Sequence, residues 1–302
     1  MKSVIRSLGL SLLASISCMT ASGAFAGESA QSVGPLLRQP SMNVFRRYAA
    51  DPEKMFEFYG PVLGLEQLQT YSVGGGQQVA RFQLGDSADS QIKLTKRVPN
   101  KEYRPGRVED ATGLRLLALT FPDEQAVVQR FREHGFAAPE FRSVSGSERR
   151  VALVTDPDGQ YVELDVVPNA ELSVYKTLEV GLTVSDIERS RSFYRDFAGL
   201  EELPPADDPL FHTKKYPFRH GTTVVSLRSF GAGLPADTGS GGIQYVVHDI
   251  EKVDALAKAR QLVIDQPLGE LRGFQLRTIW LQDPDGITNY FAETAQSRQA
   301  AQ

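Results

Sequence analysis

Two of the four histidines, His212 and His220, lie in one short stretch of unusual composition. Residues 207–220 hold both imidazoles together with three aromatic side chains and three cations. An imidazole titrates close to neutral pH, so either histidine suits the role of a general base. The alternative is an ordinary surface loop. His134 and His248 are predicted to be exposed near helix ends, without a chemical role.

The only cysteine, Cys18, falls in an N-terminal segment with the features of a secretory signal peptide. A basic start is followed by an apolar run over residues 8–19 and by small residues up to Ala26, which predicts a signal peptide over residues 1–26. A lipid anchor on Cys18 is the alternative. Cleavage after Ala26 leaves a chain without cysteine, which excludes disulfides, thiol nucleophiles and thiolate metal sites. The predicted location is the periplasm.

The overall composition limits the class of partner. The chain has 302 residues, 33 Lys and Arg against 37 Asp and Glu, and a formal net charge of −4. This balance gives no general attraction to nucleic acid or to anionic lipid, and the N-terminal apolar run is too short for a permanent anchor. We therefore predict no nucleic-acid partner and no integral membrane association. The oligomeric state stays open.

An internal repeat organises the rest of the chain. Residues 51–59, followed by Leu-Gly-Leu-Glu after a short gap, are echoed by residues 186–194, followed by Gly-Leu-Glu. An Asp-Pro-Asp-Gly sequence starts at Asp156 in the first half and at Asp283 in the second. Because the motifs recur in the same order, we infer a duplication. The predicted organisation is a linker over 27–40, a domain over 41–168, a linker over 169–174, a second domain over 175–295 and a tail over 296–302.

Each half of the repeat predicts two similar units. A short strand, residues 44–49 or 178–184, runs into an aspartate that can cap a helix. That helix carries a Phe-Tyr pair, at 58–59 or 193–194, which we expect to pack inward. A second strand and a second capping aspartate repeat this order within each half. The sequence therefore predicts four strand–helix–strands units and an α+β fold.

These motifs resemble the vicinal oxygen chelate (VOC) superfamily, which includes glyoxalase I, extradiol dioxygenases and the bleomycin- and fosfomycin-resistance proteins. The resemblance rests on the Asp-to-Phe-Tyr segments with their following Leu-Gly or Gly-Leu, and on both Asp-Pro-Asp-Gly turns. It implies two domains of paired βαβββ modules, a layout similar to that of extradiol dioxygenases. It also implies that residues 207–220 cover the mouth of a cavity as a lid. A fold of this kind does not by itself determine the reaction.

The resemblance further implies where a metal would be held. Metal-using members place His, Gln or Glu ligands at four positions of each half. The corresponding residues are Val44, Lys93, Leu116 and Glu163 in the first half, and Glu179, Ser226, Gly242 and Tyr290 in the second. Only Glu163 matches the pattern, and Glu179 replaces an expected imidazole. We therefore predict no standard metal centre, with Glu163 and Glu179 as the candidates for holding Fe, Mn, Ni or Zn.

The alternation of side chains along a strand assigns further residues to two cavity walls. The first wall is predicted to hold Arg46, Tyr48, Lys93 and Glu163, and the second Glu179, Ser226, Arg228, Gln244 and Tyr290. The predicted ligand-binding residues are Arg46, Tyr48, Lys93, Arg228 and Gln244, and the predicted catalytic residues are His220, His212 and Tyr290. The alternative for the first wall is a structural ion pair of Glu163 with Arg46 or Lys93.

The leading functional prediction is an exported protein that binds a small organic molecule, aromatic or carboxylate-bearing, and converts it, if at all, without a standard metal centre. One alternative is a metal-dependent glyoxalase-type lyase or ring-cleaving dioxygenase that uses Glu179, Tyr290 and a histidine of the 212–220 segment. A second alternative is a non-catalytic scaffold whose cavities are filled by side chains.

Overall fold

The computed structural model describes residues 32–271 and 273–299. The predicted signal peptide and Cys18 lie outside the described residues. The described part of the predicted N-terminal linker is packed against the fold. The backbone N–H of Val33 donates to the carbonyl of Phe197 at 2.7 Å, and that of Arg38 donates to the carbonyl of Val246 at 2.9 Å. A 3₁₀ turn, Gly34–Leu36, lies between these two contacts.

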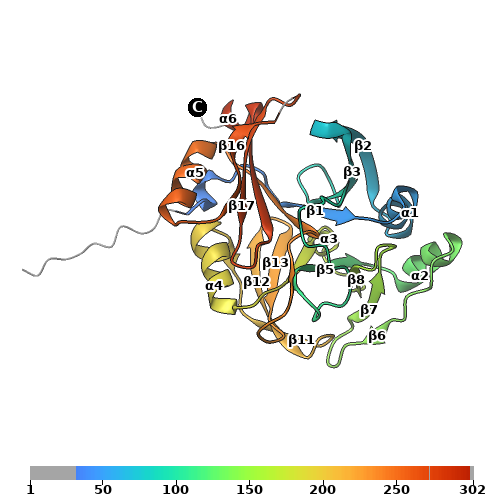
Figure 1. Ribbon diagram of the computed structural model, residues 1–302. Helices are drawn as coiled ribbons and strands as arrows, with labels where there is room; N and C mark the ends of the chain where they lie inside the picture. Colours follow the sequence, from blue (N-terminus) through green and yellow to red (C-terminus); the bar gives the residue numbers. More distant parts are fainter. Residues whose placement is uncertain (1–31, 272, 300–302) are drawn as a thin grey trace, which may run out of the picture. The chain divides into compact units, whose positions relative to one another are not determined.

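Four βαβββ modules follow one another along the chain, as predicted (Figure 1). Module 1 consists of β1 (Asn43–Tyr48), α1 (Pro52–Glu57), β2 (Glu66–Val73), β3 (Gln77–Gln83) and β4 (Gln91–Lys96). Module 2 consists of β5 (Thr112–Phe121), α2 (Glu124–Glu133), β6 (Arg142–Ser143), β7 (Arg150–Thr155) and β8 (Tyr161–Val166).

The second half repeats this order with one strand divided. Module 3 consists of β9 (Leu178–Thr183), α4 (Ile187–Arg191), β10 (Glu201–Glu202), β11 (Ala206–Asp208), β12 (Thr213–His220) and β13 (Thr223–Arg228). Module 4 consists of β15 (Gly241–Val246), α5 (Ile250–Ala259), β16 (Ile264–Glu270), β17 (Leu276–Gln282) and β18 (Thr288–Thr294). A two-residue strand, β14 (Ala236–Asp237), precedes module 4.

Two segments predicted as a linker and a tail contain short helices. Helix α3 (Leu172–Tyr175) occupies the predicted linker over 169–174, and the Tyr175 hydroxyl donates to the carbonyl of Val167 at 2.8 Å. Helix α6 (Ala295–Gln299) occupies the start of the predicted tail. There the backbone N–H of Thr294 donates to the Ser297 hydroxyl and that of Ser297 donates to the Thr294 hydroxyl, so the start of the tail is bonded to the end of β18.

The predicted helix starts are confirmed. The carboxylates of Asp51, Asp123, Asp186 and Asp249 each accept a hydrogen bond from a backbone N–H in the first turn of the following helix. Helices α1 and α4 continue as π-helical turns, Phe58–Val62 and Ser192–Phe197. Both turns bury their Phe-Tyr pair in the core, as the sequence predicts.

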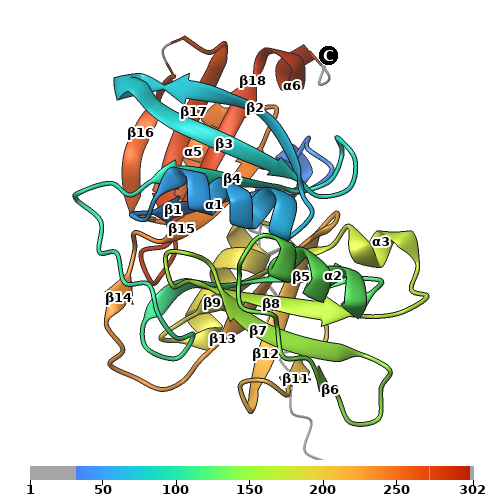
Figure 2. The ribbon, with the colours of Figure 1, turned by 90° about the vertical axis from the view of Figure 1, so that its right-hand side faces the viewer.

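The sheets combine modules from the two halves of the chain. One sheet, here called sheet A, has the order β16-β17-β18-β15-β1-β4-β3-β2, so it joins module 1 to module 4. The other, sheet B, has the order β10-β12-β13-β9-β5-β8-β7-β6 and joins module 2 to module 3. Figure 2 shows the cyan strands β2 and β3 with the orange-red β16 and β17, and the green β7 and β8 with β12 and β13. The grouping of wall residues by halves of the chain is therefore wrong.

The Asp-Pro-Asp-Gly turns connect the two sheets. In the β7–β8 turn of sheet B, the Asp158 carboxylate accepts from the backbone N–H groups of Ala49 and Ala50, which follow β1 of sheet A. In the β17–β18 turn of sheet A, Asp285 accepts from the N–H of Ser185, which follows β9 of sheet B. The repeated motif thus has a structural role at equivalent places in both halves.

Candidate functional site

The two predicted histidines do not share a lid. Residues 213–220 form β12, and an eight-residue strand separates its ends by about 25 Å. His212 lies exposed in the turn before this strand, with φ of 49°. The His220 ring lies at the other end, where Nε2 is 2.7 Å from the carbonyl oxygen of Gln39. The lid prediction is therefore wrong for this segment, because the pattern that suggested a loop belongs to a strand.

Arg46 and Tyr48 lie on the buried face of β1, not on an open wall. The Arg46 guanidinium donates to the Tyr59 hydroxyl at 3.0 Å and lies 3.6 Å from the Asp156 carboxylate. The Tyr48 ring packs edge-on against Phe56. Their predicted placement is wrong.

The predicted placement of Arg46 and Tyr48 fails because module 1 has one more residue between the last buried position of its first strand and the capping aspartate than module 3 has. The last buried residue of the first strand, Tyr48, stands three positions before the capping Asp51, whereas Val184 stands two positions before Asp186.

The two expected ligand positions, Val44 and Glu179, both stand seven residues before the capping aspartate. Because of the additional residue, Val44 lies on the buried face in module 1, whereas Glu179 lies on the open face in module 3. A shift of one residue moves every side chain of a strand to the opposite face.

Sheet B brings the two predicted metal-binding carboxylates onto one face. Glu163 on β8 and Glu179 on β9 are cross-strand neighbours of the same residue, Ala118 on β5. Two strand spacings separate their Cα atoms by about 10 Å. The two carboxylates share a face because module 2 pairs with module 3 in sheet B. The prediction gave each half of the chain its own wall and therefore separated them.

Cations occupy the oxygens of Glu179. Lys215 Nζ lies 2.6 Å from one carboxylate oxygen, and the Arg228 guanidinium lies 2.9 Å from the other. Arg228 also contacts Asp208 at 2.7 Å and is itself fully buried. Burial alone would raise the pKa of Glu179, but Lys215 and Arg228 outweigh it and lower the pKa to about 2.

Glu163 has a different partner from those predicted. Arg149 donates to it at 2.7 Å and also to Asp165, so the ion-pair alternative holds in kind but involves neither Arg46 nor Lys93. Burial raises the pKa of Glu163, and repulsion by Asp165 and Glu179 adds to the effect.

This donor set does not fit a divalent cation. A metal ion of the family's kind needs three or more protein donors with free lone pairs, whereas both carboxylates are held here by ammonium and guanidinium groups. Among the residues that the structure describes, no group of three or more His, Cys, Asp and Glu is arranged to hold a metal. Glu179 and Tyr290, paired in the metal-dependent alternative, lie in different sheets, so that ligand set is wrong.

The open face of sheet A differs from that of sheet B, because its lysine is not paired with a carboxylate in the described part of the chain. Lys93 on β4 and Phe45 on β1 are cross-strand neighbours, and Gln244 on β15 pairs with Tyr290 on β18. Lys93 Nζ donates to the side-chain oxygen of Gln244 at 2.6 Å. Three predicted site residues, Lys93, Gln244 and Tyr290, are thus brought together, although the prediction divided them between two walls.

Aromatic rings share this face of sheet A with Lys93. The Trp280 ring on β17 lies 4.9 Å from the ring of Tyr290 and 6.3 Å from that of Phe45. Near the outer ends of the sheet, the rings of Tyr71 on β2 and Phe274 in the β16–β17 loop are 5.5 Å apart. Burial, with Tyr71 as a second cause, raises the pKa of Tyr290, so its phenol is a neutral donor.

Lys93 has no acidic partner. Within residues 32–271 and 273–299, no ion pair joins it to a carboxylate, and the nearest charge that affects it is the cation Arg81. Burial and then Arg81 lower the pKa of Lys93 to about 8. The face is therefore a half-buried, positively charged patch lined by aromatic rings. We call Phe45, Lys93, Gln244, Trp280 and Tyr290 the Lys93 site.

Sequence reasoning missed several of these residues. Lys215 was read as part of a loop, although the alternation along residues 213–220 is compatible with a strand. Trp280 and Arg149 were not assigned, because their contacts come from a neighbouring strand. The alternation along β17, three residues before the second Asp-Pro-Asp-Gly turn, is the signal that could have identified Trp280.

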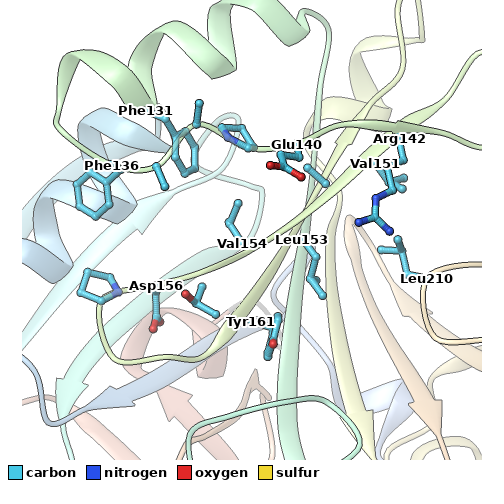
Figure 3. Close-up of a pocket in the computed structure, with 16 residues that line it drawn as sticks. Phe131, Phe136, Glu140, Arg142, Val151, Leu153, Val154, Asp156, Tyr161 and Leu210 are labelled. Atoms are coloured by element: carbon cyan, nitrogen blue, oxygen red, sulfur yellow. The ribbon is translucent and has the colours of Figure 1, made fainter.

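A separate pocket of about 730 Å³ lies beside β7 (Figure 3). It is lined by Phe131, Phe136, Leu153 and Val154 together with the loop that contains Glu140. Its lining contains neither Lys93 nor the Glu163 and Glu179 carboxylates, and its lining residue Asp156 already accepts from the Tyr59 hydroxyl at 2.9 Å. The lining also includes the polar residues Glu140, Arg142 and Tyr161, so this pocket mixes apolar and polar side chains.

In the described part of the chain, every helix is too short or too polar to cross a membrane.

Comparison with known proteins agrees with this architecture. Glyoxalase I from Zea mays is 22% identical, with a TM-score of 0.66 over 84% of this chain and 92% of the maize chain. A dioxygenase-like protein from Bacillus subtilis is 14% identical, with a TM-score of 0.60 over 86% of each chain. At these identities the likeness shows the fold alone. A search of curated protein sequences finds no significant match.

A family model settles the relationship. The model of the Glyoxalase/Bleomycin resistance protein/Dioxygenase superfamily matches residues 41–164 and again residues 176–291, which are the two halves of the repeat. The chain therefore belongs to the Glyoxalase/Bleomycin resistance protein/Dioxygenase superfamily.

Proposed function

We propose that this protein binds a small aromatic carboxylate at the Lys93 site on the open face of sheet A. The observation that carries the proposal is Lys93 itself, a half-buried cation that shares its face of the sheet with aromatic rings and whose hydrogen-bond partner, Gln244, is neutral. A buried charge is costly unless a counter-charge meets it. An anionic ligand supplies that counter-charge, and its ring would pack against Trp280 and Tyr290.

Sheet B supports the choice of sheet A by contrast. Its carboxylates and cations neutralise one another, with Glu179 held by both Lys215 and Arg228. A ligand entering there would have to break contacts of 2.6 and 2.9 Å. We assign these ion pairs a structural role.

The proposal includes export. The predicted signal peptide over residues 1–26 would deliver the mature protein to the periplasm, where a small diffusing acid could be captured. The proposed partner is the small molecule, with no nucleic acid and no membrane-spanning segment.

Intrinsic fluorescence provides a direct test, because the chain has one tryptophan and Trp280 belongs to the Lys93 site. The full-length mature protein is titrated with benzoate, with phenylacetate and with the neutral analogue benzyl alcohol. We expect a saturable change in emission with the two acids and a much weaker response to the alcohol. Absence of a saturable response to either acid would reject the proposal and favour a scaffold.

A matched pair of variants assigns the response. Lys93→Met and Lys96→Met remove the same charge from the same strand, but Lys96 is exposed and lies on the opposite face. Loss of a charge-assisted hydrogen bond weakens binding by about 10- to 100-fold. We expect this loss in Lys93→Met alone. Equal loss in both variants would show only a general charge effect.

A further inference from the structure

We propose that Lys93 forms a reversible imine with small aromatic aldehydes or ketones, so that the Lys93 site takes carbonyl compounds as well as acids. The inference rests on the proposed function for its location, but it concerns covalent chemistry that simple capture of an anion does not require. Four features of the site carry it: the partner of the amine, the neighbouring charge, the burial of the amine and a neutral acid close by.

The partner of the Lys93 amine is an amide. The side-chain oxygen of Gln244 accepts from Nζ at 2.6 Å. An amide oxygen can hold either an ammonium or a neutral amine, because both can donate a hydrogen to it. A carboxylate would instead stabilise the ammonium strongly. The Gln244 contact therefore orients the amine without fixing its charge.

The surroundings of Lys93 favour loss of a proton. Burial limits the hydration of its ammonium, and its cross-strand neighbour Arg81 is a like charge. In agreement with this geometry, the pKa of Lys93 is lowered to about 8. A desolvated lysine next to a second cation is an arrangement that makes an amine nucleophilic near neutral pH.

Tyr290 lies beside Gln244 in register across β15 and β18, on the same face. Because its pKa is raised, Tyr290 remains a neutral phenol that can donate a hydrogen bond to a carbonyl oxygen. The phenol would polarise the carbonyl as the amine attacks.

The reaction balances without an oxidant or a reductant. The nitrogen lone pair of neutral Lys93 attacks the carbonyl carbon, and the C=O π electrons move to oxygen, which takes a proton. That proton is balanced by one lost from the attacking nitrogen. The hydroxyl of this carbinolamine then takes the second proton of the nitrogen and leaves as water, while the nitrogen lone pair forms the C=N bond. Protonation of the imine nitrogen restores the positive charge at the site, which a carboxylate on the same ligand would still meet.

Lys215 is the internal control. It is also a partly buried lysine on a strand, but it is paired with the Glu179 carboxylate at 2.6 Å. Its nitrogen is held against that carboxylate oxygen and is therefore not free to attack a ligand. The same reagent applied to one protein sample therefore compares the two lysines directly.

The test traps the imine on the wild-type, full-length mature protein. The protein is treated with 4-carboxybenzaldehyde and sodium cyanoborohydride between pH 6.5 and 9, and the modified lysines are identified by peptide mass spectrometry. We expect Lys93 to be labelled about tenfold faster than the exposed Lys96, with Lys215 slower still. The rate at Lys93 should rise with pH to a plateau above about 8. Labelling of Lys93 no faster than Lys96 overturns the inference.

Two further measurements separate the inference from the proposed function. Lys93→Arg keeps a cation but cannot form an imine under these conditions, so it should lose the fast label. Benzoate binding in the wild type without fast labelling of Lys93 would reject imine formation and leave capture of acids in place. Fast labelling of Lys93 without any benzoate response would reject capture of acids and retain the imine.

Discussion

The open faces of sheets A and B occupy equivalent places in the fold and solve the problem of buried charge in opposite ways. In sheet B, every buried carboxylate of the cluster meets a cation, as Glu179 meets Lys215 and Arg228. In sheet A, Lys93 meets an amide on a face that it shares with aromatic rings. Among the described residues, the duplicated scaffold therefore neutralises the buried charges of one face and leaves a lysine without a carboxylate partner on the other.

The largest expected effect comes from breaking the charge balance of sheet B. Arg228→Met leaves Glu179 and Asp208 without their buried guanidinium partner. We expect a loss of about 3–5 kcal/mol in the free energy of unfolding, measured by urea denaturation. Arg219→Met is the control, because Arg219 and Glu201 form an exposed pair that should contribute less than about 1 kcal/mol. Similar losses in both variants would contradict the distinction.

The acid limb of the stability profile comes next in size. The pKa of Glu179 is lowered to about 2 from 4.5, so its contribution to stability is present above pH 4.5 and is lost as the pH falls towards 2. This contribution amounts to about 3 kcal/mol at most. Urea unfolding between pH 2 and 6 should therefore show a shallower acid slope in Glu179→Gln than in Glu201→Gln, which alters an exposed pair. Parallel slopes would mean that Glu179 is not strongly paired.

Removing the cation from sheet A should have the opposite sign. Lys93→Met is expected to raise the free energy of unfolding of the ligand-free protein by about 1 kcal/mol, because a cation without a counter-charge leaves a half-buried position. Since the folded state prefers neutral Lys93, wild-type stability should also gain between pH 8 and about 10.4. Lys96→Met should shift stability by less than about 0.5 kcal/mol. A destabilised Lys93→Met would show that Lys93 is structural.

The smallest effect is expected at His212. His212→Asn keeps a residue that tolerates a φ of 49°, so stability should change by less than about 0.5 kcal/mol. The fluorescence response of Trp280 to benzoate should be unchanged. Weaker benzoate binding in this variant would indicate that the ligand binds near sheet B and would contradict the contrast drawn between the two faces.

Much of the fold was predictable from short-range signals. The capping aspartates, such as Asp51 and Asp186, act within a single turn of helix. The apolar Phe-Tyr pairs are buried in the π-helical turns that continue α1 and α4. The site was less predictable. The sequence identifies Lys93, Gln244 and Tyr290 as candidates. It places Arg46 and Tyr48 on the same wall as Lys93 wrongly, because one additional residue between the last buried position of β1 and Asp51 reverses the faces of that strand.

The sequence by itself determined the four βαβββ modules, their order and their family, because caps, alternation and turns are written within each module. Only the tertiary structure decided which modules share a sheet. Strands β1 and β15, like β5 and β9, pair through backbone hydrogen bonds. Because every residue type except proline has the same backbone groups, these bonds leave no signal in the sequence that identifies the partner strand. That choice brought Lys93 to Gln244 and Glu163 to Glu179. It therefore set the charge of each open face.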